Sequence, residues 1–201
     1  MLKPICTALV ATLTLFGNTY SYAQNTDLFN EAGYRSTLYR SPTPQFHELA
    51  RTLDPQQLLE LQAKQPQVLL IDVYRNPWLR GYFTLSEVHQ NLPNSLWLAN
   101  CGDGALSEQW MAYCRQHLEQ ATAGNKAHPI VFYCRSDCWL GWNAIKRAHH
   151  LGYTNLYWLR DGIDGWAQAN LPLKVARPEA VQSTIMYYKN ETKNHVQHLN
   201  R

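Results

Sequence analysis

Short apolar runs alternate with stretches of helical periodicity along most of the chain. The clearest run is Val-Leu-Leu-Ile-Asp-Val at 68–73, which is continuous rather than alternating and ends next to an acid. Continuous runs of this kind are typical of parallel strands that are buried on both faces. Similar runs predict strands at 95–98, 130–133 and 155–158.

The segments between these runs predict helices. Asp54 is a suitable N-cap, and Pro55 follows it at the first helical position. Apolar residues recur at helical spacing through 106–118 and 144–148, and a short helix is expected at 161–167. Strands that alternate with helices indicate an α/β fold with a mainly parallel central sheet flanked by helices. We place this single domain at 46–176.

The N-terminus predicts an export signal. Lys3 precedes an apolar stretch at 5–16, and Ser21-Tyr22-Ala23 resembles a cleavage site of small residues. The stretch is too short for a convincing transmembrane helix, so an uncleaved anchor is the less favoured alternative. We therefore expect a signal peptide at 1–23 with cleavage after Ala23. An N-terminal arm at 24–45 and a polar tail at 177–201 flank the domain.

Charge and cysteine spacing narrow the function classes. The formal net charge is +3 and the basic residues are scattered, which does not support a nucleic-acid or membrane-surface role. Paired CxxC motifs are missing from the sequence, so no metal site is predicted. After export, three pairings are open to the remaining cysteines, which are Cys101, Cys114, Cys134 and Cys138.

The stretch at 131–144 carries the most chemical information. An apolar run ends in Cys134 and a helical pattern follows, which places a thiol at a helix N-terminus. Backbone N–H groups converge there and lower the pKa of a thiol. Cys138 lies four positions further on, within reach of the Cα–Cα distance of roughly 4.4–6.8 Å that a disulfide allows. A resting Cys134–Cys138 disulfide and an inert, buried Cys138 are both open alternatives.

The order of these pieces resembles the rhodanese-like domain. The matching segments are Leu70-Ile71-Asp72-Val73, Leu92-Pro93-Asn94-Ser95, Cys134, Leu151-Gly152-Tyr153, Asp161-Gly162 with Gly165-Trp166, and Asn170-Leu171-Pro172. In that family a strand ends in the catalytic cysteine, which attacks a sulfur donor and carries a persulfide. The resemblance implies that Cys134 is the nucleophile of a sulfurtransferase-like site.

A narrower resemblance is to exported proteins of Gram-negative bacteria, the PQQ-dependent catabolism-associated CXXCW-motif proteins. It is carried by Asp137-Cys138-Trp139, by Trp142-Asn143-Ala144, and by Tyr39-Arg40-Ser41 in the arm. This chain has three residues between its cysteines, where the family label has two. The resemblance implies a periplasmic location and a partner among PQQ-dependent alcohol dehydrogenases or their c-type cytochromes.

The cysteine loop departs from that of a typical sulfurtransferase. Arg135 matches a frequent arginine of the family, but Asp137 replaces a frequent glycine and Trp139 replaces the last loop arginine. An added acid and a lost cation weaken the binding of thiosulfate, so efficient thiosulfate transfer is not expected. Together with Ser136, these residues form the expected anion- or ligand-binding loop.

Three further residues are assigned supporting roles. Trp142 can share a helix face with Trp139 as a stacking wall for a planar cofactor, although core packing is the commoner role of such a pair. Asn143 can bond the loop or cap the helix. Asp72, at the end of its strand, is expected to bond loop backbone.

Two functions of different kinds fit the sequence. The first is an enzyme that uses Cys134 for persulfide or thiol–disulfide chemistry, with Cys138 as partner and with no required cofactor. The second is a catalytically inactive binding module whose loop holds a redox cofactor or a partner dehydrogenase or cytochrome. Cys101 and Cys114 either form a structural disulfide or pack singly, since Cys114 also fits the apolar face of its helix.

Overall fold

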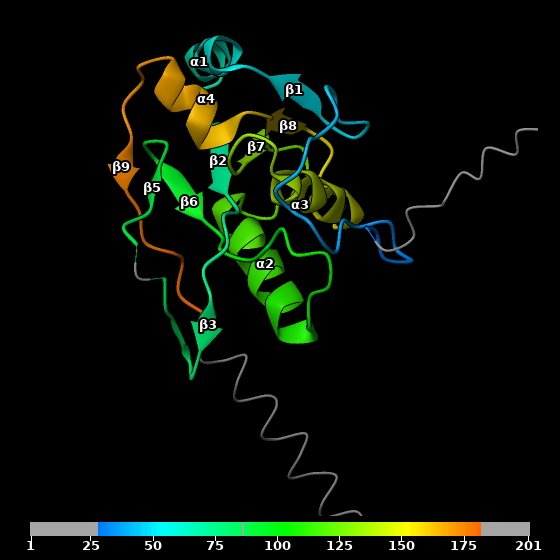
Figure 1. The fold of residues 1–201 in the computed structure, drawn as a ribbon. Coiled ribbons are helices and arrows are strands. Elements are labelled where there is room, and N and C mark those ends of the chain that lie inside the picture. The colour runs from blue at the N-terminus through cyan, green and yellow to red at the C-terminus, as the bar shows by residue number, and fades with distance from the viewer. Residues whose placement is uncertain (1–27, 86, 182–201) are drawn as a thin grey trace, which may run out of the picture.

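The computed structural model describes residues 28–85 and 87–181, so the predicted signal peptide lies outside the described residues. The chain folds around a five-stranded sheet in the order β1–β8–β7–β2–β6, in which all neighbouring strands are parallel (Figure 1). These strands are β1 (Arg51–Leu53), β2 (Leu69–Asp72), β6 (Ser95–Trp97), β7 (Ile130–Tyr133) and β8 (Leu156–Leu159). The predicted α/β fold with a parallel central sheet is confirmed.

Helices cover both faces of this sheet. They are α1 (Pro55–Lys64), α2 (Glu108–Ala121), α3 (Trp139–His150) and α4 (Gly162–Gln168), with α1 and α4 on one face and α2 and α3 on the other (Figure 1). Ile71 and Phe132 pack in the core on the α2–α3 side, and Leu70 and Val131 pack in the core on the α1–α4 side. Since both faces are covered, the strand at the centre is apolar throughout, and all four residues of β7 are buried.

Helix α1 starts as the sequence predicts. Asp54 Oδ1 accepts a hydrogen bond from Gln57 N at 2.8 Å, and Gln57 Oε1 accepts one from Asp54 N at 3.0 Å. This reciprocal pair is a capping box, and Pro55 occupies the first turn, where its missing N–H costs nothing. The Asp54-Pro55 signal is therefore confirmed as a helix start.

The hydrophobic pattern misses the shortest elements. Strand β1 has three residues and pairs with β8 at the edge of the sheet. The segment 76–90, for which no element is predicted above, contains a hairpin of β3 (Trp78–Leu79) and β4 (Tyr82–Phe83). A second small ladder joins β5 (Gln90–Asn91) to β9 (Lys174–Val175). Elements of two or three residues are too short to show a period of alternation.

The beginning of the predicted polar tail lies on the folded surface. Glu179 N donates to Trp97 O at 2.9 Å, and the Tyr113 hydroxyl donates to Glu179 O at 3.1 Å. His117 Nε2 lies 3.0 Å from the carbonyl oxygen of Ala180. Residues 177–181 therefore run beside β6 and α2.

Cys101 and Cys114 form a disulfide with an S–S distance of 2.01 Å. It joins the loop after β6 to α2, and both residues are buried in the core on that side of the sheet. Of the two alternatives for this pair, the structure therefore contains the bridge. Cys114 still contributes to the buried face of its helix.

Two observations concern membranes and metals. Within 28–85 and 87–181, no helix is long and apolar enough to cross a bilayer. The same residues contain no group of three His, Cys, Asp or Glu side chains that could hold a metal ion.

Candidate active site

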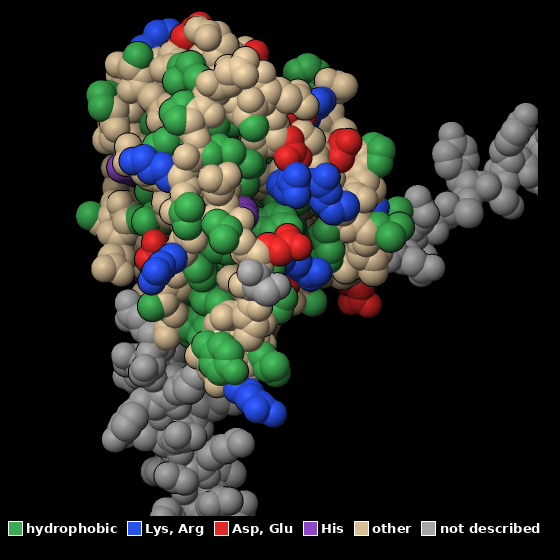
Figure 2. Space-filling view, turned by 60° about the vertical axis from the view of Figure 1, so that its left-hand side comes forward, with side chains coloured by type: hydrophobic (Ala, Val, Ile, Leu, Met, Phe, Trp, Pro, Cys, Tyr) green, Lys and Arg blue, Asp and Glu red, His purple; other side chains and the backbone are tan. Residues whose placement is uncertain are grey.

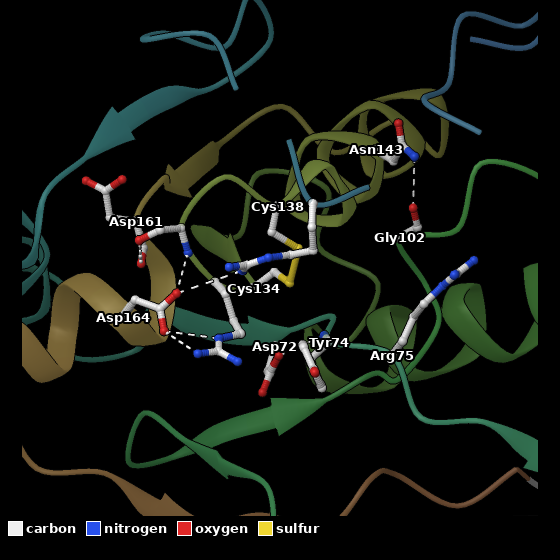
Figure 3. Close-up of a disulfide and its surroundings, with 12 residues drawn as sticks. Asp72, Tyr74, Arg75, Gly102, Cys134, Cys138, Asn143, Asp161 and Asp164 are labelled. Carbon is white, nitrogen blue, oxygen red and sulfur yellow. Dashed lines mark hydrogen bonds and ion pairs between the residues drawn. A yellow bond between two sulfur atoms is a disulfide. The ribbon is translucent and has the colours of Figure 1, made fainter. Parts of the chain in front are cut away.

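Cys134 and Cys138 form the second disulfide of the described chain, and it lies between the central strand and α3 (Figure 3). Strand β7 ends at Tyr133, and Cys138 is the N-cap residue of α3, so the loop between them is closed by the bridge. The two Cα atoms are 6.1 Å apart, within the range of ordinary disulfides. Both residues are 2% exposed. Of the two alternatives for Cys138, the structure contains the disulfide.

Arg135 and Ser136 are tied to the start of α4 by a single carboxylate. Asp164 Oδ1 accepts hydrogen bonds from Arg135 Nε at 3.0 Å and Nη2 at 2.9 Å (Figure 3). Asp164 Oδ2 accepts from Ser136 N at 3.0 Å, and the Ser136 hydroxyl donates to Asp161 O. The hydrogen bond that Arg135 donates to the Asp164 carboxylate raises the pKa of Arg135. An anion that approaches the loop therefore meets an Arg135 guanidinium whose Nε and Nη2 already bond Asp164, and a Ser136 amide that is already bonded.

Asp137 shows why glycine is frequent at its position in related loops. Its φ is +50°, in the left-handed region that glycine enters without strain and that aspartate tolerates better than most residues. Its Oδ1 accepts from Thr43 N at 3.2 Å, and its carbonyl accepts from Ser41 N at 3.1 Å. The Asp137 carboxylate thus fixes the cysteine loop to the arm, and it adds no positive charge that could bind an anionic ligand.

The arm covers the cysteine loop. Trp139 N donates to Tyr39 O at 2.9 Å, and Arg40 forms an antiparallel bridge with Cys138. The Trp139 indole N–H also donates to Ser41 Oγ at 3.1 Å. Nothing in the periodicity of the arm indicates this contact, because residues 28–45, the part of the arm that the structure describes, make no helix and only isolated strand pairs.

Trp139 and Trp142 are packed on both sides. Trp139 is 8% exposed and has the Arg35 guanidinium 4.9 Å from its ring centroid. Trp142 lies 4.0 Å from the His47 ring and meets Trp158 edge-on at 5.6 Å. The two rings contact each other at 5.4 Å, as their spacing predicts. The structure thus favours packing over a stacking wall for a planar cofactor.

Asn143 serves neither the loop nor the helix cap. It is completely buried, and its Oδ1 accepts from Arg35 N at 2.9 Å. Its Nδ2 donates to Arg35 O at 2.8 Å and to Gly102 O at 2.9 Å (Figure 3). Both expectations for this residue are corrected: Asn143 joins the arm and the loop after β6 to α3.

Asp72 bonds loop backbone as expected and also has a partner that the sequence did not suggest. Its Oδ1 accepts from Tyr74 N at 2.8 Å, and its Oδ2 lies 2.6 Å from His89 Nε2. Asp72 is completely buried, and this burial raises its pKa. The His89 ring is stacked on Tyr74 at 4.8 Å and lies 4.2 Å from Trp97.

Two cavities flank the loop. The larger, of about 460 Å³, is lined by residues that include Tyr39, Arg40, Tyr74, Arg75, Arg135 and Cys138. The smaller, of about 210 Å³, shares Tyr74 and Arg135 with it and reaches His89. On the face of the molecule that Figure 2 shows, Lys and Arg side chains lie next to acidic side chains and a hydrophobic patch. A third cavity, of about 510 Å³, lies by β6 and α2, away from the cysteine loop.

A buried parallel strand that delivers a cysteine loop to the start of a helix is the arrangement of a rhodanese-like α/β domain. The chain matches the Rhodanese-like domain over residues 54–169, more than half of its length. It belongs to the rhodanese-like domain family. No curated protein sequence matches it.

Several solved structures resemble the fold at low sequence identity. The polysulfide-sulfur transferase homodimer of Wolinella succinogenes is 18% identical, with a TM-score of 0.40 over 62% of this chain and 78% of that one. The thiosulfate sulfurtransferase of Pseudomonas aeruginosa is 13% identical, with a TM-score of 0.42 over 68% of this chain and only 23% of that one. An uncharacterized protein of Saccharomyces cerevisiae is 22% identical, with a TM-score of 0.39 over 60% of this chain and 92% of that one.

Proposed function

We propose that this rhodanese-like protein performs thiol–disulfide or persulfide chemistry with Cys134 and Cys138. The observation that carries the proposal is the disulfide between these residues at the end of the central strand. A thiolate is the nucleophile in sulfur transfer, and the bonded form has none. The protein therefore has to be reduced before it can accept sulfur, and the oxidised form is its resting state.

In the persulfide route, Cys134 and Cys138 together supply the electrons that reduce the transferred sulfur. In the reduced protein, the Cys134 thiolate takes a sulfur atom from a donor and becomes a persulfide. The Cys138 thiol then attacks the Cys134 sulfur, hydrosulfide leaves with the outer sulfur, and the Cys134–Cys138 disulfide forms. The two electrons that reduce the transferred sulfur come from the two thiols. Two equivalents of an external thiol then reduce the Cys134–Cys138 disulfide, leave as a disulfide of their own and restore the two protein thiols.

We do not expect this loop to transfer sulfur efficiently from thiosulfate. The Arg135 guanidinium and the Ser136 amide bond Asp164, and the Trp139 amide bonds Tyr39 O. A small dianion would have to displace these partners, and the lost loop arginine at 139 is not replaced by another cation in the loop. The loop of this chain is better suited to holding its own disulfide closed.

The location and partners follow from the sequence resemblance. The predicted signal at 1–23 supports export to the periplasm, an oxidising compartment where the disulfides would persist. The CXXCW-type resemblance supports a role beside PQQ-dependent alcohol catabolism, with a dehydrogenase or c-type cytochrome as partner. No cofactor is required by the proposed cysteine chemistry.

An inactive binding module is the second candidate. Its support is the burial of both sulfur-bearing residues together with the contacts of the arm across the loop. In this version the disulfide is structural and the surface around it holds a redox cofactor or a protein partner. The two candidates differ in whether the disulfide can be opened in the folded protein.

Thiol labelling separates them. The full chain is alkylated under air, with and without prior treatment by a mild reductant, and the labelled peptides are mapped. The proposed function predicts no labelling of Cys134 or Cys138 under air and labelling of both after reduction without unfolding. A freely alkylated Cys134 under air contradicts the disulfide pair, and a disulfide that opens only in denaturant supports the inactive module.

Sulfur transfer is then measured with the reduced protein. Thiosulfate and cyanide are supplied, and thiocyanate is compared with that of a Cys134→Ser variant. The proposal predicts little thiocyanate from thiosulfate but release of hydrosulfide from an organic persulfide in the wild type alone. Thiocyanate formation well above that of the variant would make the protein an ordinary thiosulfate sulfurtransferase.

A further inference from the structure

The larger cavity beside the loop borders one residue of the disulfide. Cys138 is the cysteine that lines it, together with side chains from the arm, from the segment after β2 and from α3. Its volume of about 460 Å³ falls in the range of sites for small organic molecules, which is roughly 300–1,000 Å³. A sulfur-containing inorganic anion would leave most of this space empty.

The walls of the cavity combine cations with apolar surface. Arg40, Arg75 and Arg135 line it, and Leu38 and Leu140 add aliphatic surface. The Arg75 guanidinium also lies 4.4 Å from the centroid of the Tyr39 ring. Such a lining suits a molecule with an apolar body and an acidic group.

The positive charge of this cavity is only partly compensated. Asp103 bonds Arg75 Nε at 2.5 Å, while Asp164 bonds Arg135 and lies 3.9 Å from Arg40 Nη1. Two carboxylates thus serve three guanidinium groups, which leaves one positive charge in excess. Each guanidinium carries five N–H donors, so free donors remain for a carboxylate or sulfonate.

We infer that this cavity binds an anionic organic thiol, whose sulfur attacks Cys138 Sγ. The inference rests on the proposed thiol–disulfide function and adds the substrate class and the sulfur that is attacked. The bond between the two cysteine sulfurs breaks, a bond forms between the substrate sulfur and Cys138, and Cys134 leaves as a thiolate. A second thiol then attacks the mixed disulfide, which yields the substrate disulfide and the reduced protein.

The direction of cleavage is consistent with the place of Cys134. Its sulfur is bonded to that of the N-cap residue of α3, a twelve-residue helix. Both sulfurs lie by the positive end of this helix dipole, which favours a thiolate on either of them, so the cavity decides which sulfur is attacked. Cys138, unlike Cys134, is among the residues that line the cavity from which a thiol can approach.

The test compares thiols of different charge on the oxidised full chain. Disulfide opening is followed by alkylation and mass shift with 3-mercaptopropionate, 2-mercaptoethanol and cysteamine at equal thiolate concentrations and low salt. The inference predicts opening at least tenfold faster with the anionic thiol than with cysteamine. Arg75→Gln and Arg40→Gln reduce this preference at least threefold each, whereas Arg51→Gln, on the far edge strand β1, leaves it unchanged.

Peptide mapping identifies the attacked sulfur. Trypsin cleaves after Arg135, so Cys134 and Cys138 fall on separate peptides of an acid-quenched, alkylated reaction. The inference predicts the mercaptopropionate adduct on the 136–146 peptide and the alkyl group on the 127–135 peptide. The reverse distribution, or equal rates for anionic and cationic thiols, overturns the inference and leaves the proposed function standing. A disulfide that no thiol opens in the folded protein contradicts both.

Discussion

Asp72 Oδ2 and His89 Nε2 lie 2.6 Å apart, and the His89 side chain is 8% exposed while that of Asp72 is fully buried. The pair sits where β2 ends, and Asp72 is in register with Tyr133, the residue before Cys134. Tyr74 is stacked on the His89 ring and donates its backbone N–H to the other Asp72 oxygen. One buried carboxylate, that of Asp72, thus bonds both Tyr74 and His89 next to the strand that leads into Cys134.

Replacement of Asp72 is expected to destabilise the fold strongly. Asp72→Ala leaves the Tyr74 N–H and the His89 ring nitrogen without their acceptor in a buried place, at a cost of about 3 kcal/mol. Asp72→Asn keeps one oxygen for Tyr74 and, by a change of the His89 tautomer, a bond to the ring, so its loss should be smaller. Urea unfolding of both variants measures the difference. Equal destabilisation by Ala and Asn would show that the carboxylate's partners contribute little.

Much of the fold could be predicted because its main elements carry local signals. The continuous runs at β2 and β7 reflect strands covered on both faces, and the Asp54-Pro55 pair encodes a capping box that depends only on adjacent turns. Strand β1 and the β3–β4 hairpin lack such signals. Their pairing depends on partners elsewhere in the fold, not on a pattern of their own.

The residues of the candidate site likewise fall into those that local sequence signals indicate and those that only long-range contacts bring together. Cys134 and Cys138 could be found from the sequence, because the end of a strand, the start of a helix and a short cysteine spacing are all local. Asp164 and His89 could not, since they meet Arg135 and Asp72 across 29 and 17 residues. The sequence does not predict the role of Asn143 for the same reason, because its partner Arg35 lies 108 residues away.

The Cys101–Cys114 disulfide is expected to stabilise the fold without taking part in the chemistry. It closes a loop of 13 residues' separation, and bridges of about this size contribute about 3 kcal/mol, chiefly by restricting the unfolded chain. A Cys101→Ala/Cys114→Ala variant should lose about that much in urea unfolding under non-reducing conditions. The same variant should still open its Cys134–Cys138 bridge at the wild-type rate. A large change in that rate would place the first bridge in the reaction.

Stability should decrease in mild acid because of His47. Its Nδ1 accepts from Leu49 N at 3.0 Å and its Nε2 lies 3.2 Å from Trp142 O, so the ring is held in one neutral tautomer. Burial lowers the pKa of His47 in the fold, and the unfolded chain therefore binds the proton more readily. This contribution is complete above the unfolded pKa of about 6.5 and is lost as pH falls through the folded value.

The measurement is urea unfolding of wild type and His47→Gln between about pH 7.5 and pH 5. The wild type should lose up to about 1.4 kcal/mol per pH unit more than the variant over the lower part of this range. The difference between the unfolding free energies of the two proteins at each pH removes the effect of the other titrating groups. Parallel curves for the two proteins would mean that His47 is protonated equally in the folded and unfolded states.

Asp137 provides a test of the loop backbone. At φ +50° a residue with a Cβ is strained by about 1 kcal/mol relative to glycine, although aspartate suffers less than most. Asp137→Ala should therefore be less stable than Asp137→Gly by about 1 kcal/mol in urea unfolding, even though alanine normally restricts the unfolded chain. Asp137→Asn keeps both the tolerance of this region and an acceptor for Thr43 N, so it should stay within about 0.5 kcal/mol of the wild type. An alanine variant as stable as the glycine variant would indicate that the loop relaxes out of the left-handed conformation.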